Sequence, residues 1–102
     1  RGIVTGQGGL LAGLRAGVRH LLGITYAAPP VGALRWRSPR PAAAWPGVRD
    51  ATRHGHACPQ HLGDYPEAWV NDALRAAGLD EDCLTVNVWA PAGGGPYPVM
   101  FY

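Results

Sequence analysis

Residues 29–46, a stretch dense in proline, limit most strongly what this chain can fold into. Proline fixes φ and has no backbone N–H to donate, so neither a helix nor a central strand can run through the stretch. Its five prolines are Pro29, Pro30, Pro39, Pro41 and Pro46. Because Leu34, Trp36 and Trp45 are too large and apolar for a bare flexible linker, we expect an ordered surface path over residues 27–47 that these side chains pin to a core.

The residues before this stretch carry a strand pattern. Residues 3–5 and 10–14 are apolar or prone to β structure, and the pattern resumes over residues 18–26. Residues 15–17 supply a turn between them, because Gly17 can adopt a positive φ. We therefore expect two or three short strands that include an antiparallel hairpin.

The residues after the proline-rich stretch predict one helix and further strands. A run of apolar residues between Pro66, near a first helical turn, and Gly78, a stop signal, predicts a short helix. Residues 84–89 alternate with a period of two, which is typical of a half-buried strand. The Gly- and Pro-rich residues 91–98 predict an exposed turn, and residues 98–102 predict the start of another strand.

The overall composition excludes several classes of protein. Of the 102 residues, 47% are hydrophobic and 16% are charged, which argues against intrinsic disorder and fits one small domain. The formal net charge is only +2, and the arginines are scattered rather than clustered as in a nucleic-acid-binding protein. No apolar run approaches the roughly 20 residues that a membrane span needs. We therefore expect neither a nucleic-acid partner nor a membrane span.

Three local patterns could carry chemistry, and each has a plainer interpretation. Residues 6–9 are rich in glycine, but the spacing of a dinucleotide-binding loop fails and no helix pattern follows. Ser38, the one serine, lacks the Gly-flanked turn and nearby base of an activated nucleophile, so we interpret it as a loop residue. The His and Cys residues within residues 54–61 could share a zinc ion, yet no second pair of ligands follows. We favour surface histidines beside a structural cysteine; a small metal-binding module is the alternative.

Two pairs of residues have the chemistry to fasten the chain to itself. Cys58 and Cys83, the only cysteines, can close a loop by a disulfide in an oxidising compartment or lie together as two thiols in a reducing one. Arg35 and Glu81 stand beside rigid features, and a guanidinium can hold a carboxylate by two parallel hydrogen bonds. The residues alone give no further reason to pair these two.

Four segments, read in order, resemble the N-terminal region of the type-B carboxylesterases, the carboxylesterase and cholinesterase branch of the α/β-hydrolase fold. They are residues 23–36 (GITYAAPPVGALRW), 45–52 (WPGVRDAT), 58–60 (CPQ) and 81–91 (EDCLTVNVWAP). The chain departs from the family's pattern at two positions, namely Thr25 in place of proline and Asp80 in place of serine. A strand accepts the β-branched threonine, and aspartate keeps a small acceptor for nearby backbone donors.

This resemblance implies an α/β fold, of the N-terminal portion of an α/β-hydrolase only. Its parts would be an antiparallel hairpin with strands of a mixed sheet, the proline-rich path and a loop with a short helix between the cysteines. Residues 1–102 would then be an N-terminal fragment of a single carboxylesterase-type domain. Trp69 does not match the spacing of the ammonium-binding tryptophan of cholinesterase-like members, so we expect it to pack on a helix face.

The resemblance also implies structural roles for both candidate pairs. Cys58 and Cys83 match the cysteines of the family's first disulfide, whose loop lines one side of the active-site gorge. Arg35 and Glu81 match an ion pair that ties the base of this loop to the preceding segment, for which we expect bidentate geometry.

For function, the resemblance implies a parent protein that hydrolyses carboxylic esters through an acyl-enzyme. Its substrate would be a small-molecule ester, it would need no metal or organic cofactor, and the chain's partner would be the remainder of its own domain. The nucleophile, acid, base and oxyanion hole would all follow Tyr102, so the 102 residues alone should be inactive and contain no catalytic residue. The alternative is a non-catalytic binding or adhesion relative on the same fold.

Overall fold

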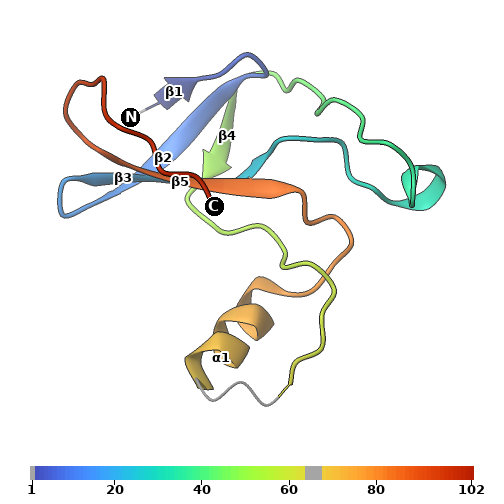
Figure 1. Cartoon of the computed structure of the whole chain (residues 1–102). Helices are drawn as coiled ribbons and strands as arrows, with labels where there is room; N and C mark the ends of the chain where they lie inside the picture. The colour runs from blue at the N-terminus through green and yellow to red at the C-terminus, as the bar shows by residue number, and fades with distance from the viewer. Residues whose placement is uncertain (1, 64–67) are drawn as a thin grey trace.

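The structure is a computed structural model that describes residues 2–63 and 68–102. Their main feature is one mixed sheet, whose path runs β1-β2-β3-β5 while β4 pairs with β2 (Figure 1). The strands are β1 (Gly2–Val4), β2 (Gly9–Arg15), β3 (Val18–Thr25), β4 (Val48–Ala51) and β5 (Thr85–Pro91). All pairings are antiparallel except that of β4, which runs parallel to the first half of β2. This arrangement agrees with the expected N-terminal portion of an α/β-hydrolase sheet.

The expected hairpin is formed by β2 and β3. Arg15 pairs with Val18, so the turn consists of Ala16 and Gly17 alone. Both residues have positive φ, 50° and 76°, which is the backbone conformation that a two-residue hairpin turn requires. The turn prediction over residues 15–17 is therefore confirmed.

The period-two segment forms β5, which pairs with β3 along its length. The register shifts between Leu21 and Ile24, so β3 contains a bulge at this point. At the bulge the backbone N–H of Gly23 donates to Oδ1 of Asn87, 2.9 Å away. A side chain of β5 thus supplies the hydrogen bond that the interrupted ladder lacks.

A small core lies on one face of the sheet. Leu10, Leu21 and Ala51 are buried there, and the residues that pack against them are Ile3, Ala12, Ile24 and Trp45. The core therefore joins β1, β2, β3 and β4 into one unit.

Trp45 pins the proline-rich path to this core, as expected. Its indole Nε1 donates to the carbonyl oxygen of Gly9 at 2.9 Å. Its backbone N–H donates to the carbonyl oxygen of Gln7. A Cβ at Gly8 would lie only 2.6 Å from this indole, so Gly8 leaves the ring its space. These contacts place residue 45 immediately before β4.

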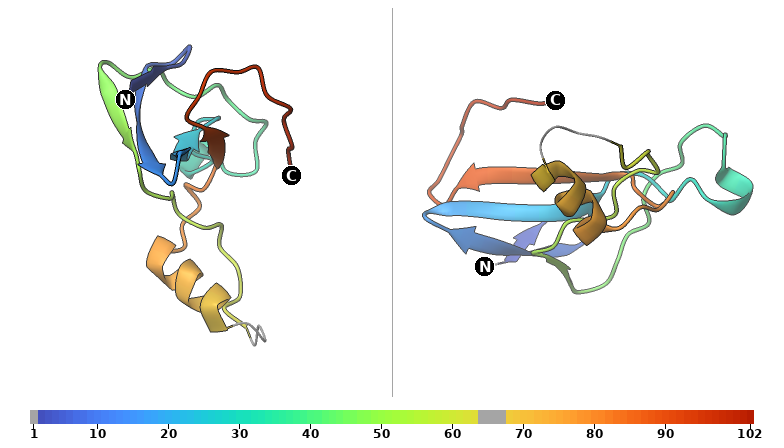
Figure 2. Two further views of the ribbon diagram at one scale, coloured as in Figure 1. Left: turned by 90° about the vertical axis from the view of Figure 1, so that its left-hand side faces the viewer. Right: turned by 90° about the horizontal axis from the view of Figure 1, so that it is seen from below.

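Trp36, by contrast, was expected to be an anchor, and that expectation is wrong. The 3-10 helix η1 (Gly32–Leu34) is followed by a turn in which Trp36 has a φ of 59°. The side chain points outward and is 90% exposed, while the guanidinium of Arg35 lies 5.4 Å from its ring centroid. This end of the path extends away from the sheet (Figure 2), so no core lies within reach of the indole.

The helix α1 (Ala68–Ala77) lies between the two cysteines, where the sequence predicts one. It ends at Gly78, whose φ of 76° and N–H bond to the carbonyl of Leu74 close the last turn. Pro66, the predicted start signal, lies outside the described residues. The helix projects away from the sheet (Figures 1 and 2), and Trp69 on it is 70% exposed. The predicted packing of Trp69 is therefore wrong, because the helix projects instead of packing on the sheet.

Two further predictions differ from the structure. Residues 98–102 form no strand, and the side chains of Val99, Met100 and Phe101 are 84–88% exposed, because no strand among the described residues lies beside them to pair with. The strand β4 had not been expected as an element, since its residues VRDA carry little apolar pattern. No helix in the described ranges is long and apolar enough to span a membrane.

Candidate functional site: the base of the cysteine loop

The base of the loop between the cysteines is closed by backbone hydrogen bonds. The N–H of Ala57 donates to the carbonyl of Gly78 at 2.8 Å, and the N–H of Asp80 donates back to the carbonyl of Ala57 at 3.1 Å. Ala57 thereby forms an isolated parallel bridge with Leu79. The residue before Cys58 is thus fixed against the segment that leads to residue 83.

This closure brings Cys58 and Cys83 together as free thiols. Cys58 is exposed and Cys83 is half-buried. The pKa of the Cys83 thiol is raised to about 11, mainly by a hydrogen-bonding contact with the side chain of Cys58. Burial and the negative charges of Asp82 and Asp80 raise that pKa further. The two side chains are neighbours, as both sequence-based alternatives require, and no S–S bond joins them in this structure.

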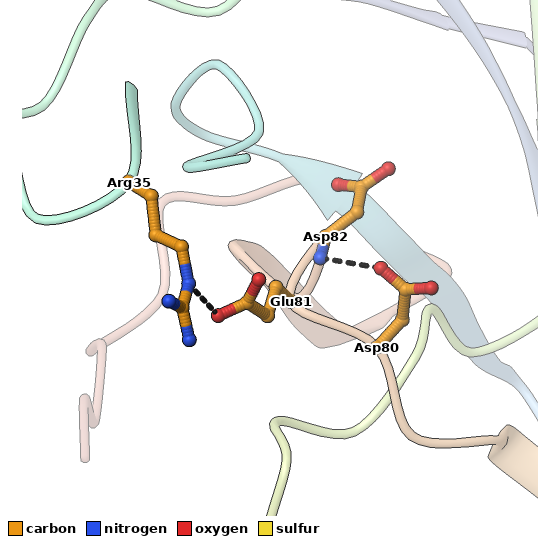
Figure 3. Close-up of polar contacts among 4 residues, drawn as sticks. All are labelled: Arg35, Asp80, Glu81 and Asp82. Carbon is orange, nitrogen blue, oxygen red and sulfur yellow. Dashed lines mark hydrogen bonds and ion pairs between the residues drawn. The ribbon is translucent and has the colours of Figure 1, made fainter. Parts of the chain in front are cut away.

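Arg35 and Glu81 also meet at the base of the loop. Arg35 follows η1, and its Nε donates to Oε1 of Glu81 at 2.6 Å (Figure 3). The structure shows one hydrogen bond between the two groups, where we had expected two parallel ones. Both side chains remain about half exposed, at 52% and 44%. Solvent therefore screens their attraction, and the pair orients the two segments more than it stabilises them.

A compact turn presents Glu81 to the arginine. The N–H of Asp82 donates to Oδ1 of Asp80 at 2.7 Å (Figure 3), and the N–H of Cys83 donates to the carbonyl of Glu81 at 3.0 Å. An aspartate that binds the backbone two residues onward is a common turn former. Asp80 therefore performs the acceptor role that the sequence suggested for it.

At the loop base, the loop, α1 and the start of β5 line an open cavity of about 700 Å³. Its wall includes His54, His56, Cys58 and Cys83, together with the last two turns of α1. Ser38 does not line this cavity and is exposed on the proline-rich path. Within residues 2–63 and 68–102, no three His, Cys, Asp or Glu side chains are grouped to hold a metal ion. The wall therefore offers two thiols and two imidazoles.

Sequence reasoning missed the tight crossing that sets the shape of this wall. A Cβ on Gly23, whose φ is 65°, would lie 2.8 Å from the carbonyl oxygen of Arg53. A Cβ on Gly55 would lie 2.8 Å from Cγ2 of Thr85. Residues 53–55 thus pack closely against β3 at Gly23 and against the side chain of Thr85, in β5, at Gly55. The sequence signal for this crossing was Asn87, a polar residue within a strand pattern, which accepts the hydrogen bond from the N–H of Gly23.

Comparisons with known proteins place these features in context. A sequence model described as the carboxylesterase family matches residues 1–102. The chain is 44% identical over 98 residues to fumonisin B1 esterase of Sphingopyxis macrogoltabida, covering 94% of this chain and 17% of that protein. It is also 44% identical over 89 residues to human neuroligin-2, covering 78% of this chain and 11% of that protein.

The fold has solved counterparts as well. It matches a PNB esterase with a TM-score of 0.76 and 36% identity, covering 91% of this chain and 18% of that one. Taken together, the chain spans between a tenth and a fifth of the length of these relatives.

Proposed function

Because this chain belongs to the carboxylesterase family, we propose that it is the N-terminal part of a single α/β-hydrolase domain that hydrolyses carboxylic esters. The observation that carries the proposal is the family match over all 102 residues, together with the fold shared with a PNB esterase. Fumonisin B1 esterase, at 44% identity, supports a small-molecule ester as the substrate class. The reaction would pass through an acyl-enzyme and need no metal or organic cofactor.

In this proposal the chain supplies scaffold and contains no catalytic residue. Its only serine, Ser38, is exposed and lies outside the cavity at the loop base. An acyl-enzyme needs a nucleophile within hydrogen-bond reach of a base, and Ser38 lacks the Gly-flanked turn that usually exposes a catalytic serine. The 102 residues alone are therefore proposed to be inactive and to act with the remainder of their domain.

The cysteines would fasten the loop of this scaffold. We propose that Cys58 and Cys83 form a disulfide in an oxidising compartment, since the backbone already holds them side by side. The chain-entropy model gives roughly 3.5 kcal/mol for closing a loop of about 25 residues. Non-reducing peptide mapping of the secreted or periplasmic protein would detect the linked pair; separate thiol peptides from that source would contradict the disulfide.

The central experiment compares the complete gene product with the 102-residue chain. With p-nitrophenyl butyrate, the complete protein should release a burst of p-nitrophenol equal to its concentration, and its intact mass should gain a butyryl group. The isolated chain should do neither. Ser38→Ala in the complete protein is the matched control and should leave the burst unchanged. Loss of the burst in that variant, or acylation of the isolated chain, would overturn the assignment.

The second candidate is a non-catalytic binding or adhesion protein. Its support is specific: neuroligin-2, whose name denotes no hydrolase, is as similar to this region as fumonisin B1 esterase is, at 44% identity each. The same experiment decides between the two. A folded, complete protein that forms no acyl adduct with p-nitrophenyl butyrate would favour the binding protein.

A further inference from the structure

We propose that the outer edge of β5 is the docking site for a strand from the remainder of this protein's own domain. The inference rests on the proposed function only in taking such a remainder to exist, and it adds the surface that the remainder would use. The chain covers 17% of fumonisin B1 esterase and 18% of the PNB esterase, so relatives of this kind carry far more polypeptide than the sheet described above.

The first support is the contrast between β5 and the other edges of the sheet. The strands β1 and β4 have only three and four residues, and β4 carries the charged residues Arg49 and Asp50. Short strands and charged side chains are the usual protection of a sheet edge against further pairing. The strand β5 ends the path of the sheet, yet it has seven residues, TVNVWAP, and none of them is charged. This edge therefore lacks the protection that the other edges have.

The second support is the direction of the backbone groups in β5. In an antiparallel ladder, successive residues alternate between bonding to the neighbouring strand and facing away from it. The N–H of Ala92 donates to the carbonyl of Gly17 at 2.8 Å, directly beyond the last pair of the β3–β5 ladder. Counting back from this bond, the N–H and carbonyl of Trp89 face away from β3. Among the described strands, none pairs with β5 on that side.

The third support is the distribution of apolar side chains on β5. Val88 and Trp89 are successive residues of the strand, so they lie on opposite faces of the sheet, and they are 40% and 56% exposed. Apolar residues on both faces are typical of a strand in the interior of a sheet that is covered on both sides. The strand thus has the side chains of an interior strand at the position of an edge strand. One more strand beside it would remove this mismatch.

The test measures hydrogen exchange at the backbone N–H of Trp89 in the complete gene product and in the 102-residue chain. This N–H should exchange about 100-fold more slowly in the complete protein, because a docked strand would accept its hydrogen bond. The N–H groups on the outer side of β4 are the control and should exchange alike in both. Unchanged exchange at Trp89 in the complete protein would overturn the proposal. Protection already present in the isolated chain would also overturn it, because a second copy or residues 98–102 would then occupy the edge.

A matched pair of variants tests the same edge through stability. Trp89→Lys and Val48→Lys each place a charge at an apolar position on an edge strand, 56% and 66% exposed. In the complete protein, Trp89→Lys should raise the unfolding equilibrium constant roughly 100-fold, because the charge would be buried beside the docked strand. Val48→Lys should raise it less than about 3-fold. Equal effects of the two substitutions would overturn the proposal.

Neither measurement depends on ester hydrolysis. A complete protein that protects the N–H of Trp89 but gives no burst with p-nitrophenyl butyrate would contradict the proposed function and leave the docking site standing. A complete protein that gives the burst while this N–H stays unprotected would contradict the docking site alone.

Discussion

The sheet and the cysteine loop of this chain are held together in different ways. The sheet combines continuous backbone pairing with a buried cluster, in which Leu10 is only 2% exposed. The loop projects from the sheet, leaves Trp69 70% exposed and is fastened near its base by backbone hydrogen bonds. The comparison teaches that the sheet depends on packing, whereas the loop depends on a few polar and thiol contacts around residues 57–58 and 78–83. Substitutions in the two regions should therefore have separable effects.

The largest effect is expected from the core. Leu10→Ala removes a fully buried side chain and should cost about 3 kcal/mol, or about 100-fold in amide protection against hydrogen exchange over β2 and β3. Leu14→Ala, at a position 67% exposed on the same strand, is the matched control and should change protection little. Equal losses in the two variants would show that the sheet does not depend on this cluster.

The next effect should appear where residues 53–55, which lead from the sheet to the loop, touch β3. Gly23→Ala must accommodate a Cβ 2.8 Å from the carbonyl of Arg53, whereas Gly17→Ala meets nothing within 4 Å. Both glycines have positive φ, so the conformational cost of about 1 kcal/mol is shared and only Gly23→Ala adds an overpacking cost of about 2 kcal/mol. Hydrogen exchange of residues 53–57 should report the difference. If Gly17→Ala raised hydrogen exchange as much as Gly23→Ala does, the close contact at Gly23 would not be the cause of the loss.

A smaller effect, confined to the loop, follows from Cys83. Its pKa is raised from 9.0 to about 11 in the folded chain, so folding favours the neutral thiol. This contribution to stability is complete below pH 9.0, and it is lost as pH rises toward 11 because the unfolded chain ionises first. Alkylation of Cys83 by iodoacetamide should accordingly show its midpoint near pH 11 in the native chain and near 9 in urea. Coinciding midpoints would contradict the raised pKa.

The smallest effect is expected from the ion pair. Arg35→Ala and Glu81→Ala should each cost less than about 1 kcal/mol, because both side chains are about half exposed. A double-mutant cycle read by exchange at residues 80–83 isolates their coupling. Glu81→Gln keeps an oxygen acceptor for the Nε donor of Arg35 but removes the negative charge, so it separates the hydrogen bond from the Coulomb attraction. A coupling free energy well above about 1 kcal/mol would show that the ion pair stabilises the loop base much more than its exposure predicts.

Much of the fold could be predicted because its signals are local. A turn ending in Gly17 and the alternation over residues 84–89 specify β2, β3 and β5, and Gly78 marks the end of α1. The strand β4 escaped prediction because it depends on a non-local parallel pairing with β2. The same limit explains Trp36 and Trp45, which look alike in the sequence, although only Trp45 lies within reach of the core.

The candidate site was predictable in part, and mainly through resemblance. The residues alone could name the cysteines but left their state open, and they gave no reason to join Arg35 to Glu81. The resemblance suggested that pair, yet only the structure shows its single hydrogen bond through Nε. The crossing at Gly23 and Gly55 could not be predicted, because a glycine's close neighbours come from segments distant in the chain.

The fit of Trp45 against Gly8 carries a consequence for how this chain can vary. A methyl group at residue 8 would overlap the indole, with contacts of 2.6 Å to Nε1 and to the backbone carbonyl of Trp45. The two positions are therefore expected to change together, with a bulkier residue 8 tolerated only beside a smaller ring and a shifted backbone at residue 45. Directed libraries that randomise both sites should recover linked substitutions, and those that randomise residue 8 alone should return glycine.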